Sequence, residues 1–392
     1  TLLSKHEPKD NQPHGDSILH KAYGTFRFAY QNVLGISTYQ DFADATELAA
    51  YIQSNQINCF GMSETNLNWR DTNARYAVRS KLSALIKPMK LQTSASTSAF
   101  TTPYQPGGTV TVLQGNRVAS VFDQGEDPYG KGRWSFITLE GREKTKLTVI
   151  TAYRVCKTHG AKTAYSQQQS LQMQRGIENP DPRKQCLKDL KEFINKRRAD
   201  PLHSIIVMMD ANENIMDRNS QIAAFIQQTG LVDVHGMKHG YDNDPATHHT
   251  GSRRIDYILV SPALIEFIPA AGIEPFGTGK PSTHRSMFFD IYLAAFLRGE
   301  ALPISSPQAR YLRCSQPDNV TQYITEVWKY YNKHFVEERV KQLHRDINIY
   351  GLNRCIRNRL NTVDRDVITG RLAAENKLPH YRSVPWSLSL QE

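Results

Sequence analysis

The chain has 392 residues, of which 39% are hydrophobic, and a formal net charge of +10 at pH 7. This length and hydrophobic fraction suffice for a large folded core plus an appendage. No stretch approaches the roughly 18 to 20 consecutive apolar residues of a membrane span, so no membrane partner is expected. The positive charge favours a polyanionic partner such as nucleic acid, although a basic protein without such a partner has the same composition.

Cysteine usage indicates the redox environment. The five cysteines are widely spaced and form no CxxC pair: Cys59, Cys156, Cys186, Cys314 and Cys355. This pattern argues against a disulfide framework and a structural zinc site, so we expect a reducing compartment, nuclear or cytoplasmic. The chain begins with Thr1 and shows no signal-peptide core, which suggests that it is cut from a longer protein.

Three parts are predicted along the chain. Residues 1–25 are polar and aperiodic, which predicts an N-terminal arm, and residues 26–297 alternate between apolar runs and turn residues. Nine runs predict strands: FRFAYQNV (26–33), INCFGM (57–62), TVTVL (109–113), RVASVF (117–122), WSFITL (134–139), KLTVITAY (146–153), SIIVMM (204–209), IDYILV (255–260) and MFFDIYL (287–293). Residues 298–392 form the third part.

Helices are interleaved with these strands. We expect one over residues 44–53 and another over residues 182–198, where Asp181 can cap and Pro182 suits the first helical position. The mixture predicts an α/β or α+β sandwich of two packed sheets with helices outside. RGEALPISSPQAR (298–310) predicts a linker and residues 317–335 a helix; the part from Arg345 onward is weakly periodic, and no element is predicted for VPWSLSLQE (384–392).

Polar residues recur at or near the ends of the predicted strands. They are Asn32, Glu64, Tyr153, Asp210 with Asn212, Asp256 and His284. Charges at the edge of a buried sheet must be hydrated, paired or bound to a cation. Taken singly, each position also fits a capped turn, a satisfied buried polar residue or a half-buried aromatic.

The motifs QNVLGI, SETN, TAYR, MDANEN, RRIDYILVS and PSTHR, in this order, resemble the endonuclease/exonuclease/phosphatase superfamily. Within it they are most similar to the AP-endonuclease-like endonuclease domains of LINE-type (non-LTR) retrotransposons. The resemblance covers residues 26–293. It implies a DNase I-like, four-layered α/β sandwich of two mostly antiparallel sheets flanked by helices, here with a C-terminal helical appendage, and a site where loops at one edge of both sheets converge.

The resemblance also implies roles for individual residues. Glu64, with Asn32 beside it, would bind Mg²⁺, for which Mn²⁺ is an alternative. Asp210 would orient or deprotonate the attacking water. Asn212 would hold water or phosphate, and Tyr153 would contact the phosphate. Such groups suit phosphodiester hydrolysis, in which a cation offsets negative charge on the phosphoryl oxygens while a carboxylate activates water.

The PSTHR motif carries both a match and a departure. His284 would donate hydrogen bonds to a non-bridging phosphate oxygen, and Asp256 would fix its imidazole. The family usually has aspartate immediately before this histidine, but here Thr283 offers a neutral hydroxyl, a poorer ligand for a hard cation. Thr283 is therefore a degenerate metal position that puts activity in doubt.

Residues after the SETN motif predict a nucleic-acid surface. Basic groups are combined there with an aromatic ring, in Asn66, Trp69, Arg70, Arg75 and Arg79. Basic side chains can contact the phosphate backbone while the ring stacks on a base or sugar. A solvated surface without a ligand is the alternative.

Four histidines lie further along the chain: His235, His239, His248 and His249. They lack metal-ligand spacing and favour a polar loop near DNA over a zinc site.

The expected function is a Mg²⁺-dependent endonuclease that nicks DNA, with duplex DNA as the expected partner. We expect it to be part of a retroelement polyprotein that also carries a reverse transcriptase domain, for which the nick would serve reverse transcription. The C-terminal phrases RYL, PDNVTQYI and PWS loosely resemble the segment that joins the two enzymes in such elements. Two alternatives stay open: a non-catalytic DNA-binding module with a degenerate metal site, and an RNA nuclease or phosphatase of the same superfamily.

Overall fold

The structure of the chain is a computed structural model that describes residues 11–98, 104–158, 160, 163–242, 244–300, 316–351 and 353–378. The chain divides into two compact units, Thr1–Ile304 and Ser305–Glu392. In the described part, none of the helices combines the length and apolar character needed to span a membrane.

The first unit contains a seven-stranded mixed sheet. Its strands, in spatial order, are β1 (His14–Gly15), β12 (Ala270–Ile273), β13 (Met287–Ile291), β2 (Phe26–Asn32), β3 (Cys59–Ser63), β5 (Thr109–Gln114) and β4 (Met89–Ser94). The neighbours β2 and β3 are parallel, and the other pairs are antiparallel. The parallel pair needs a crossover, which helix α1 (Ala43–Ser54) supplies.

The second sheet has six strands. In spatial order they are β10 (Val232–Asp233), β11 (Asp256–Val260), β9 (His203–Asp210), β8 (Lys146–Tyr153), β7 (Trp134–Glu140) and β6 (Val121–Glu126). Here β8 and β9 are the parallel pair. They are joined through α3 (Ala164–Met173) and α4 (Pro182–Arg198). Strand β9 is apolar along nearly its whole length because both of its faces are buried.

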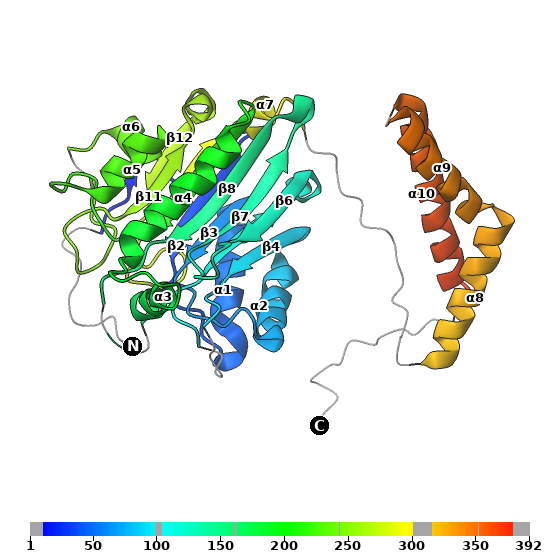
Figure 1. Ribbon diagram of the computed structural model, residues 1–392, viewed down its shortest axis with the longest axis horizontal. Coiled ribbons are helices and arrows are strands. Elements are labelled where there is room, and N and C mark those ends of the chain that lie inside the picture. Colours follow the sequence, from blue (N-terminus) through cyan, green and yellow to red (C-terminus); the bar gives the residue numbers. More distant parts are fainter. Residues whose placement is uncertain are drawn as a thin grey trace. The chain divides into compact units, whose positions relative to one another are not determined.

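The two sheets pack face to face and helices cover their outer faces, which gives four layers (Figure 1). Residues such as Phe28 and Met208 fill the space between the sheets. Helices α1 and α2 (Thr72–Leu85) pack on the seven-stranded sheet, and α4 and α5 (Gln221–Thr229) pack on the six-stranded sheet. The predicted four-layered, mostly antiparallel α/β sandwich is therefore confirmed.

Short helices complete the first unit. They are η1 (Gln40–Phe42), η2 (Asn116–Ser120), η3 (Arg142–Lys144), α6 (Val234–His239), η4 (Pro262–Phe267) and α7 (Leu293–Phe296). The predicted cap of the second long helix is confirmed, because the Asp181 side chain accepts hydrogen bonds from the backbone N–H groups of Arg183 and Lys184.

Some local predictions were wrong. The RVASVF run begins as η2, and only its last two residues enter β6. The N-terminal arm is not entirely separate, since His14 and Gly15 pair with β12 and Ile18 is buried. Most of the predicted linker 298–310 lies outside the described residues.

The described residues of the second unit form three helices, α8 (Pro317–Lys333), α9 (Val336–Tyr350) and α10 (Arg354–Glu375). Helix α8 confirms the helix predicted over residues 317–335. The part from Arg345 onward is more regular than its weak periodicity predicts, because Leu343, Ile356 and Val363 form a small apolar core between α9 and α10. Residues 384–392 lie outside the described residues.

Candidate active site

Strand register brings the predicted polar residues to one edge of both sheets. In the parallel pairs, Asn32 lies opposite Ser63, directly before Glu64, and Tyr153 lies opposite Asp210. Strand β11 runs antiparallel to β9, so its first residue, Asp256, also lies opposite Asp210. Parallel strands end at the same edge and an antiparallel neighbour starts there, which explains how residues so distant in sequence meet.

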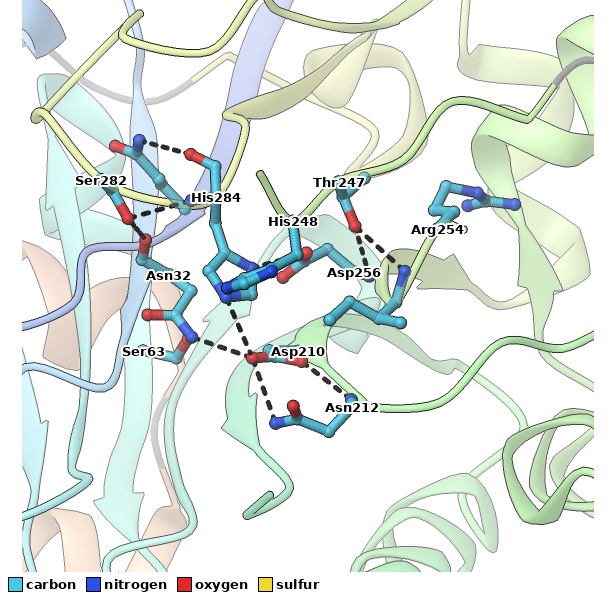
Figure 2. A network of polar contacts seen from close by, with 12 residues as sticks. Asn32, Ser63, Asp210, Asn212, Thr247, His248, Arg254, Asp256, Ser282 and His284 are labelled. Atoms are coloured by element: carbon cyan, nitrogen blue, oxygen red, sulfur yellow. Dashed lines mark hydrogen bonds and ion pairs between the residues drawn. The ribbon is translucent and has the colours of Figure 1, made fainter. Parts of the chain in front are cut away.

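A cavity of about 730 Å³ opens at this edge. The predicted residues that line it are Glu64, Asn66, Tyr153, Asp210, Asn212, Thr283 and His284. Asn32 and Asp256 lie behind them, fully buried, and contact them by hydrogen bonds. Figure 2 shows five of these side chains converging from both sheets: Asn32, Asp210, Asn212, Asp256 and His284.

Asn32 links two carboxylates. Its Nδ2 donates to Glu64 Oε2 and to Asp210 Oδ2, each at 2.8 Å, while its Oδ1 accepts the backbone N–H of Leu34 at 3.1 Å. The amide therefore presents its donors to the carboxylates, and its oxygen accepts one backbone hydrogen bond. This geometry makes Asn32 a residue that positions Glu64 and Asp210, and its predicted role as a metal ligand stays a prediction.

Asp210 is held by hydrogen bonds yet remains difficult to ionise. Its Oδ1 accepts the backbone N–H of Asn212 at 2.8 Å, and Asn212 Nδ2 lies 3.3 Å from Oδ2 and 2.8 Å from the carbonyl oxygen of Arg154. Burial and then the charge of Asp256 raise the pKa of Asp210 to about 7, against the opposing effect of His284. A carboxyl group with this pKa can exchange a proton near neutral pH.

His284 is buried between two aspartates. Its Nδ1 lies 2.9 Å from Asp256 Oδ2, and its Nε2 lies 3.9 Å from Asp210 Oδ2. Burial alone would lower the pKa of His284, but the charge and hydrogen bond of Asp256, followed by the charge of Asp210, raise it to about 9. The side chain is therefore an imidazolium at neutral pH, with Nδ1–H donating to Asp256 and Nε2–H left at the cavity.

The turn before His284 fixes its backbone. The Ser282 hydroxyl donates to the carbonyl oxygen of Asn32 at 2.6 Å and accepts the backbone N–H of His284 at 3.2 Å. Gln31 Nε2 donates to the His284 carbonyl oxygen at 3.1 Å. Ser282 thus ties the histidine turn directly to β2, the strand that ends in Asn32.

Ligand atoms of Asp210, Asp256 and His284 lie within 4.8 Å of one another, a spacing that could hold a metal ion. Asp256 Oδ1 is buried and has no hydrogen-bond partner among the described residues, so it keeps an acceptor for a cation or a water. An imidazolium cannot coordinate a metal, however, because binding requires the neutral ring. The carboxylate oxygens of the cavity, including Glu64, are better donors for a hard cation.

Tyr153 and Thr283 border the same cavity. Burial, followed by the charges of Glu64 and Asp210, holds the pKa of Tyr153 well above its usual range, so the phenol stays neutral and can donate a hydrogen bond. The carbonyl oxygen of Thr283 accepts the backbone N–H of His249 at 2.7 Å. Thr283 thus lies at the cavity, beside the residues that the resemblance assigns to catalysis.

His248 is a cavity residue without a predicted individual role. Its ring meets the His284 ring edge-on, with centroids 4.8 Å apart, and the backbones of the two residues form an isolated β-bridge. Thr247 Oγ1 holds the same loop by accepting the N–H groups of Ile255 and Asp256. The histidine-rich loop was the only sequence signal for this position.

The predicted nucleic-acid residues separate into three groups. Asn66 lines the cavity, and its Oδ1 accepts the N–H of Gly107 at 2.8 Å. Arg70, Arg75 and Arg79 are exposed on α2 and the turn before it, outside the cavity lining. The prediction for Trp69 was wrong: its side chain is only 2% exposed, and its Nε1 donates to Thr65 Oγ1 at 2.8 Å, so it packs in the core and cannot stack on a base.

No protein-family model matches the chain, and no curated protein matches it. Among solved structures, the AP endonuclease LMAP from Leishmania major aligns with a TM-score of 0.50 and 16% identity over 68% of this chain and 87% of that one. The human Nocturnin catalytic domain with bound sulfate aligns with a TM-score of 0.47 and 14% identity over 68% of this chain and 94% of that one. An AP endonuclease from Archaeoglobus fulgidus aligns with a TM-score of 0.47 and 15% identity over 68% of this chain and 99% of that one. The first likeness supports one conclusion: the chain has the DNase I-like fold.

Proposed function

We propose that this chain is a Mg²⁺-dependent phosphodiesterase that nicks DNA. One observation carries the proposal: in a DNase I-like fold, the buried pair Asp256–His284 places an imidazolium beside Asp210, a carboxyl group whose pKa is near 7, at the wall of an open cavity. Hydrolysis of a phosphodiester needs a positive donor for the developing charge and a base for water, and these two side chains have the corresponding protonation states.

His284 is the proposed donor to a non-bridging phosphate oxygen, through Nε2–H. Asp256 positions the ring and keeps it protonated, as in other Asp–His pairs. Asp210 accepts the proton of the attacking water, Tyr153 supplies a neutral hydrogen bond to water or phosphate, and Asn212, whose amide N–H groups are engaged, keeps Oδ1 as an acceptor for water. Each of these roles uses the hydrogen-bonding capacity left at the cavity after the contacts described above.

Glu64 is the proposed cation ligand. It is a partly exposed carboxylate at the cavity, held in place by the Asn32 amide, and an oxygen donor of this kind suits Mg²⁺ or Mn²⁺. When bound, the ion would supply positive charge to the phosphoryl oxygens. Thr283 offers no second carboxylate at this place, which makes weak metal binding the expected property of this chain.

Nucleic acid is the proposed substrate because the chain carries a net charge of +10 and exposes Arg70, Arg75 and Arg79. The further proposal of a retroelement polyprotein with a reverse transcriptase domain rests on the resemblance of the sequence motifs alone. The proposal of a nuclear or cytoplasmic location rests on cysteine usage alone.

Thr283 favours a second candidate, a DNA-binding module that keeps the fold without the chemistry. Incubation of supercoiled plasmid with the protein in Mg²⁺, Mn²⁺ or EDTA separates the two candidates. We expect metal-dependent conversion to nicked circles, lost in Glu64→Gln and kept in Glu47→Gln, a control at an exposed position of α1. DNA binding without cleavage in either metal would establish the DNA-binding module. Cleavage of RNA but not of DNA would instead support the alternative of an RNA nuclease of the same superfamily.

A further inference from the structure

A second large cavity lies outside the candidate active site. This groove has a volume of about 700 Å³ and is lined mainly by residues of α4 and α5. The two helices belong to the outer layer on the six-stranded sheet (Figure 1). Leu187 and Phe225 are its apolar residues of low exposure, and polar side chains of both helices form its walls. None of the roles proposed above uses this groove.

The α4 wall of the groove is positively charged. Lys184, Lys188 and Lys191 follow one another at spacings of four and three residues, so they share one face of the helix and span about 10 Å along its axis. Lys191 Nζ donates to Gln228 Oε1 on α5 at 2.9 Å. Among the described residues, no carboxylate lies within ion-pair distance of Lys184 or Lys188.

Carboxylates are nearly missing from the lining of the groove. Of the described residues that form it, only Asp181 carries one, and its Oδ1 already accepts the first N–H groups of α4. Helix α5 contributes only apolar and amide side chains. The positive charge of the lysines is therefore uncompensated within the groove, which is the condition for attracting an anionic ligand.

One wall of the groove also contains a buried amide. Gln172 lines the groove and is 1% exposed, and its Oε1 has no hydrogen-bond partner among the described residues. That oxygen is itself shielded from solvent, so the groove would recognise a ligand through the charge of its lysines rather than through this amide.

The groove begins beside the candidate active site. Arg183, the neighbour of Lys184, donates to the carbonyl oxygens of Val155 at 2.7 Å and of Asn212 at 2.9 Å, and both of these residues border the first cavity. The row of lysines leads away from that point along α4. A nucleic-acid strand that leaves the first cavity on this side would therefore meet the lysines one after another.

We propose that this groove binds the phosphate backbone of a single-stranded segment of nucleic acid, with Lys184, Lys188 and Lys191 as the phosphate contacts. The inference rests on the proposed function in one respect, that nucleic acid is the substrate class, and it adds an anchor outside the catalytic cavity. A single strand fits better than a duplex, because packed helices lie only about 8 to 10 Å apart and the groove between them is correspondingly narrow.

Binding of a fluorescein-labelled twelve-nucleotide oligo(dT) in EDTA, followed by anisotropy at several salt concentrations, tests this site. The triple variant Lys184→Gln, Lys188→Gln, Lys191→Gln should lose at least about tenfold in affinity at low salt. The slope of log K plotted against log salt concentration should become shallower by about 2, because three phosphate contacts are lost and each neutralised phosphate of a single strand contributes about 0.7.

The matched control carries three Lys→Gln changes at exposed positions of the first unit that do not line the groove: Lys87, Lys144 and Lys196. It has the same net charge, and Lys196 lies on another face of α4, so its binding should stay close to that of the wild type. Circular dichroism should be unchanged for both variants. Equal losses in the two triple variants, or no loss in either, would overturn the groove site. So would poly-glutamate binding that depends on the groove lysines when oligo(dT) binding does not.

Plasmid nicking by the wild-type protein separates this inference from the proposed function. Absence of nicking in Mg²⁺ and Mn²⁺, together with lysine-dependent oligo(dT) binding, would reject the phosphodiesterase and leave the groove standing. Nicking combined with oligo(dT) binding that does not depend on the lysines would reject the groove site and leave the phosphodiesterase proposal standing.

Discussion

Replacing Asp256 with asparagine should lower the pKa of His284 sharply. Both side chains are almost fully buried, and Asp256 Oδ2 lies 2.9 Å from His284 Nδ1. The pKa of His284 is about 9, whereas an ordinary histidine has about 6.5, and this difference of about 2.5 pH units corresponds to about 3 kcal/mol in favour of the imidazolium. Because burial acts in the opposite direction, the interaction with Asp256 is the main source of that free energy.

In Asp256→Asn the burial effect remains while the partner charge is gone, so we expect the pKa of His284 to fall by about 2 pH units or more. NMR titration of ¹³C-labelled histidine side chains between pH 5 and 10 in EDTA measures this directly, with the His284 signal assigned from His284→Gln. Asp16→Asn is the control, since Asp16 is a carboxylate beside a different histidine, His239. If wild-type His284 titrated at or below pH 6.5, or if its pKa were unchanged in Asp256→Asn, the claim that Asp256 raises the pKa of His284 would be refuted.

The same pair links stability to pH. The folded-state pKa of His284 lies above its ordinary value, so the stabilisation is complete below about pH 6.5 and is lost as the pH rises through about 9. In urea unfolding, the stability advantage of the wild type over Asp256→Asn should therefore shrink between pH 7 and pH 10. An advantage that stays constant across this range would mean that the pair stabilises the fold by packing alone.

Three further outcomes are expected. The nicking rate should follow a bell-shaped pH profile, rising near pH 7 as Asp210 loses its proton and falling near pH 9 as His284 loses its own; a flat profile between pH 6 and 10 would contradict both assignments. Thr283→Asp should lower the Mg²⁺ concentration for half-maximal nicking by about 10-fold or more, and an unchanged metal titration would place Thr283 outside the metal shell. Arg70→Ala and Arg79→Ala should each flatten the salt dependence of duplex binding by about 0.9, and slopes unaltered by both changes would point to another surface.

The central strands and several of the polar site residues were predictable because their signals are local. A fully apolar run that ends in Asp210 marks a buried strand and its carboxylate in one stretch of sequence, and Asp256 and Tyr153 are marked in the same way. Their convergence, in contrast, depends on the parallel register of β2 with β3 and of β8 with β9, which no local pattern shows. Only the family resemblance led to the expectation that the site lies at one edge of both sheets.

Other features were missed because tertiary contacts decide them. Strand β1 has two residues and exists through its pairing with β12, and β4 is a half-exposed edge strand with the polar sequence MKLQTS. Trp69 sits among charged residues, a pattern typical of a surface, yet it is buried four positions after Thr65, the acceptor of its indole N–H. Contacts of this kind leave no periodic signal in the sequence.

The charge balance of the cavity shows why a cation matters to the proposed chemistry. Two of the carboxylates at its edge are neutralised locally, Glu213 by Arg154 and Asp217 by Arg253. Of the described residues at the catalytic end, three carboxyl groups then face a single imidazolium: Glu64, Asp210 and Asp256 against His284. Above neutral pH the group therefore carries excess negative charge and repels a phosphodiester.

This balance gives Thr283 two opposite effects. Two like charges about 4 Å apart repel by about 4 kcal/mol at the effective dielectric of a protein surface, so an aspartate at position 283 would add considerable repulsion toward DNA in the absence of metal. The threonine avoids that repulsion and at the same time removes a ligand that would hold the cation. Thr283→Asp should consequently bind DNA more weakly in EDTA while binding Mg²⁺ more tightly. If the variant instead bound DNA equally well in EDTA, the side chain at position 283 would lie too far from the phosphate for its charge to matter.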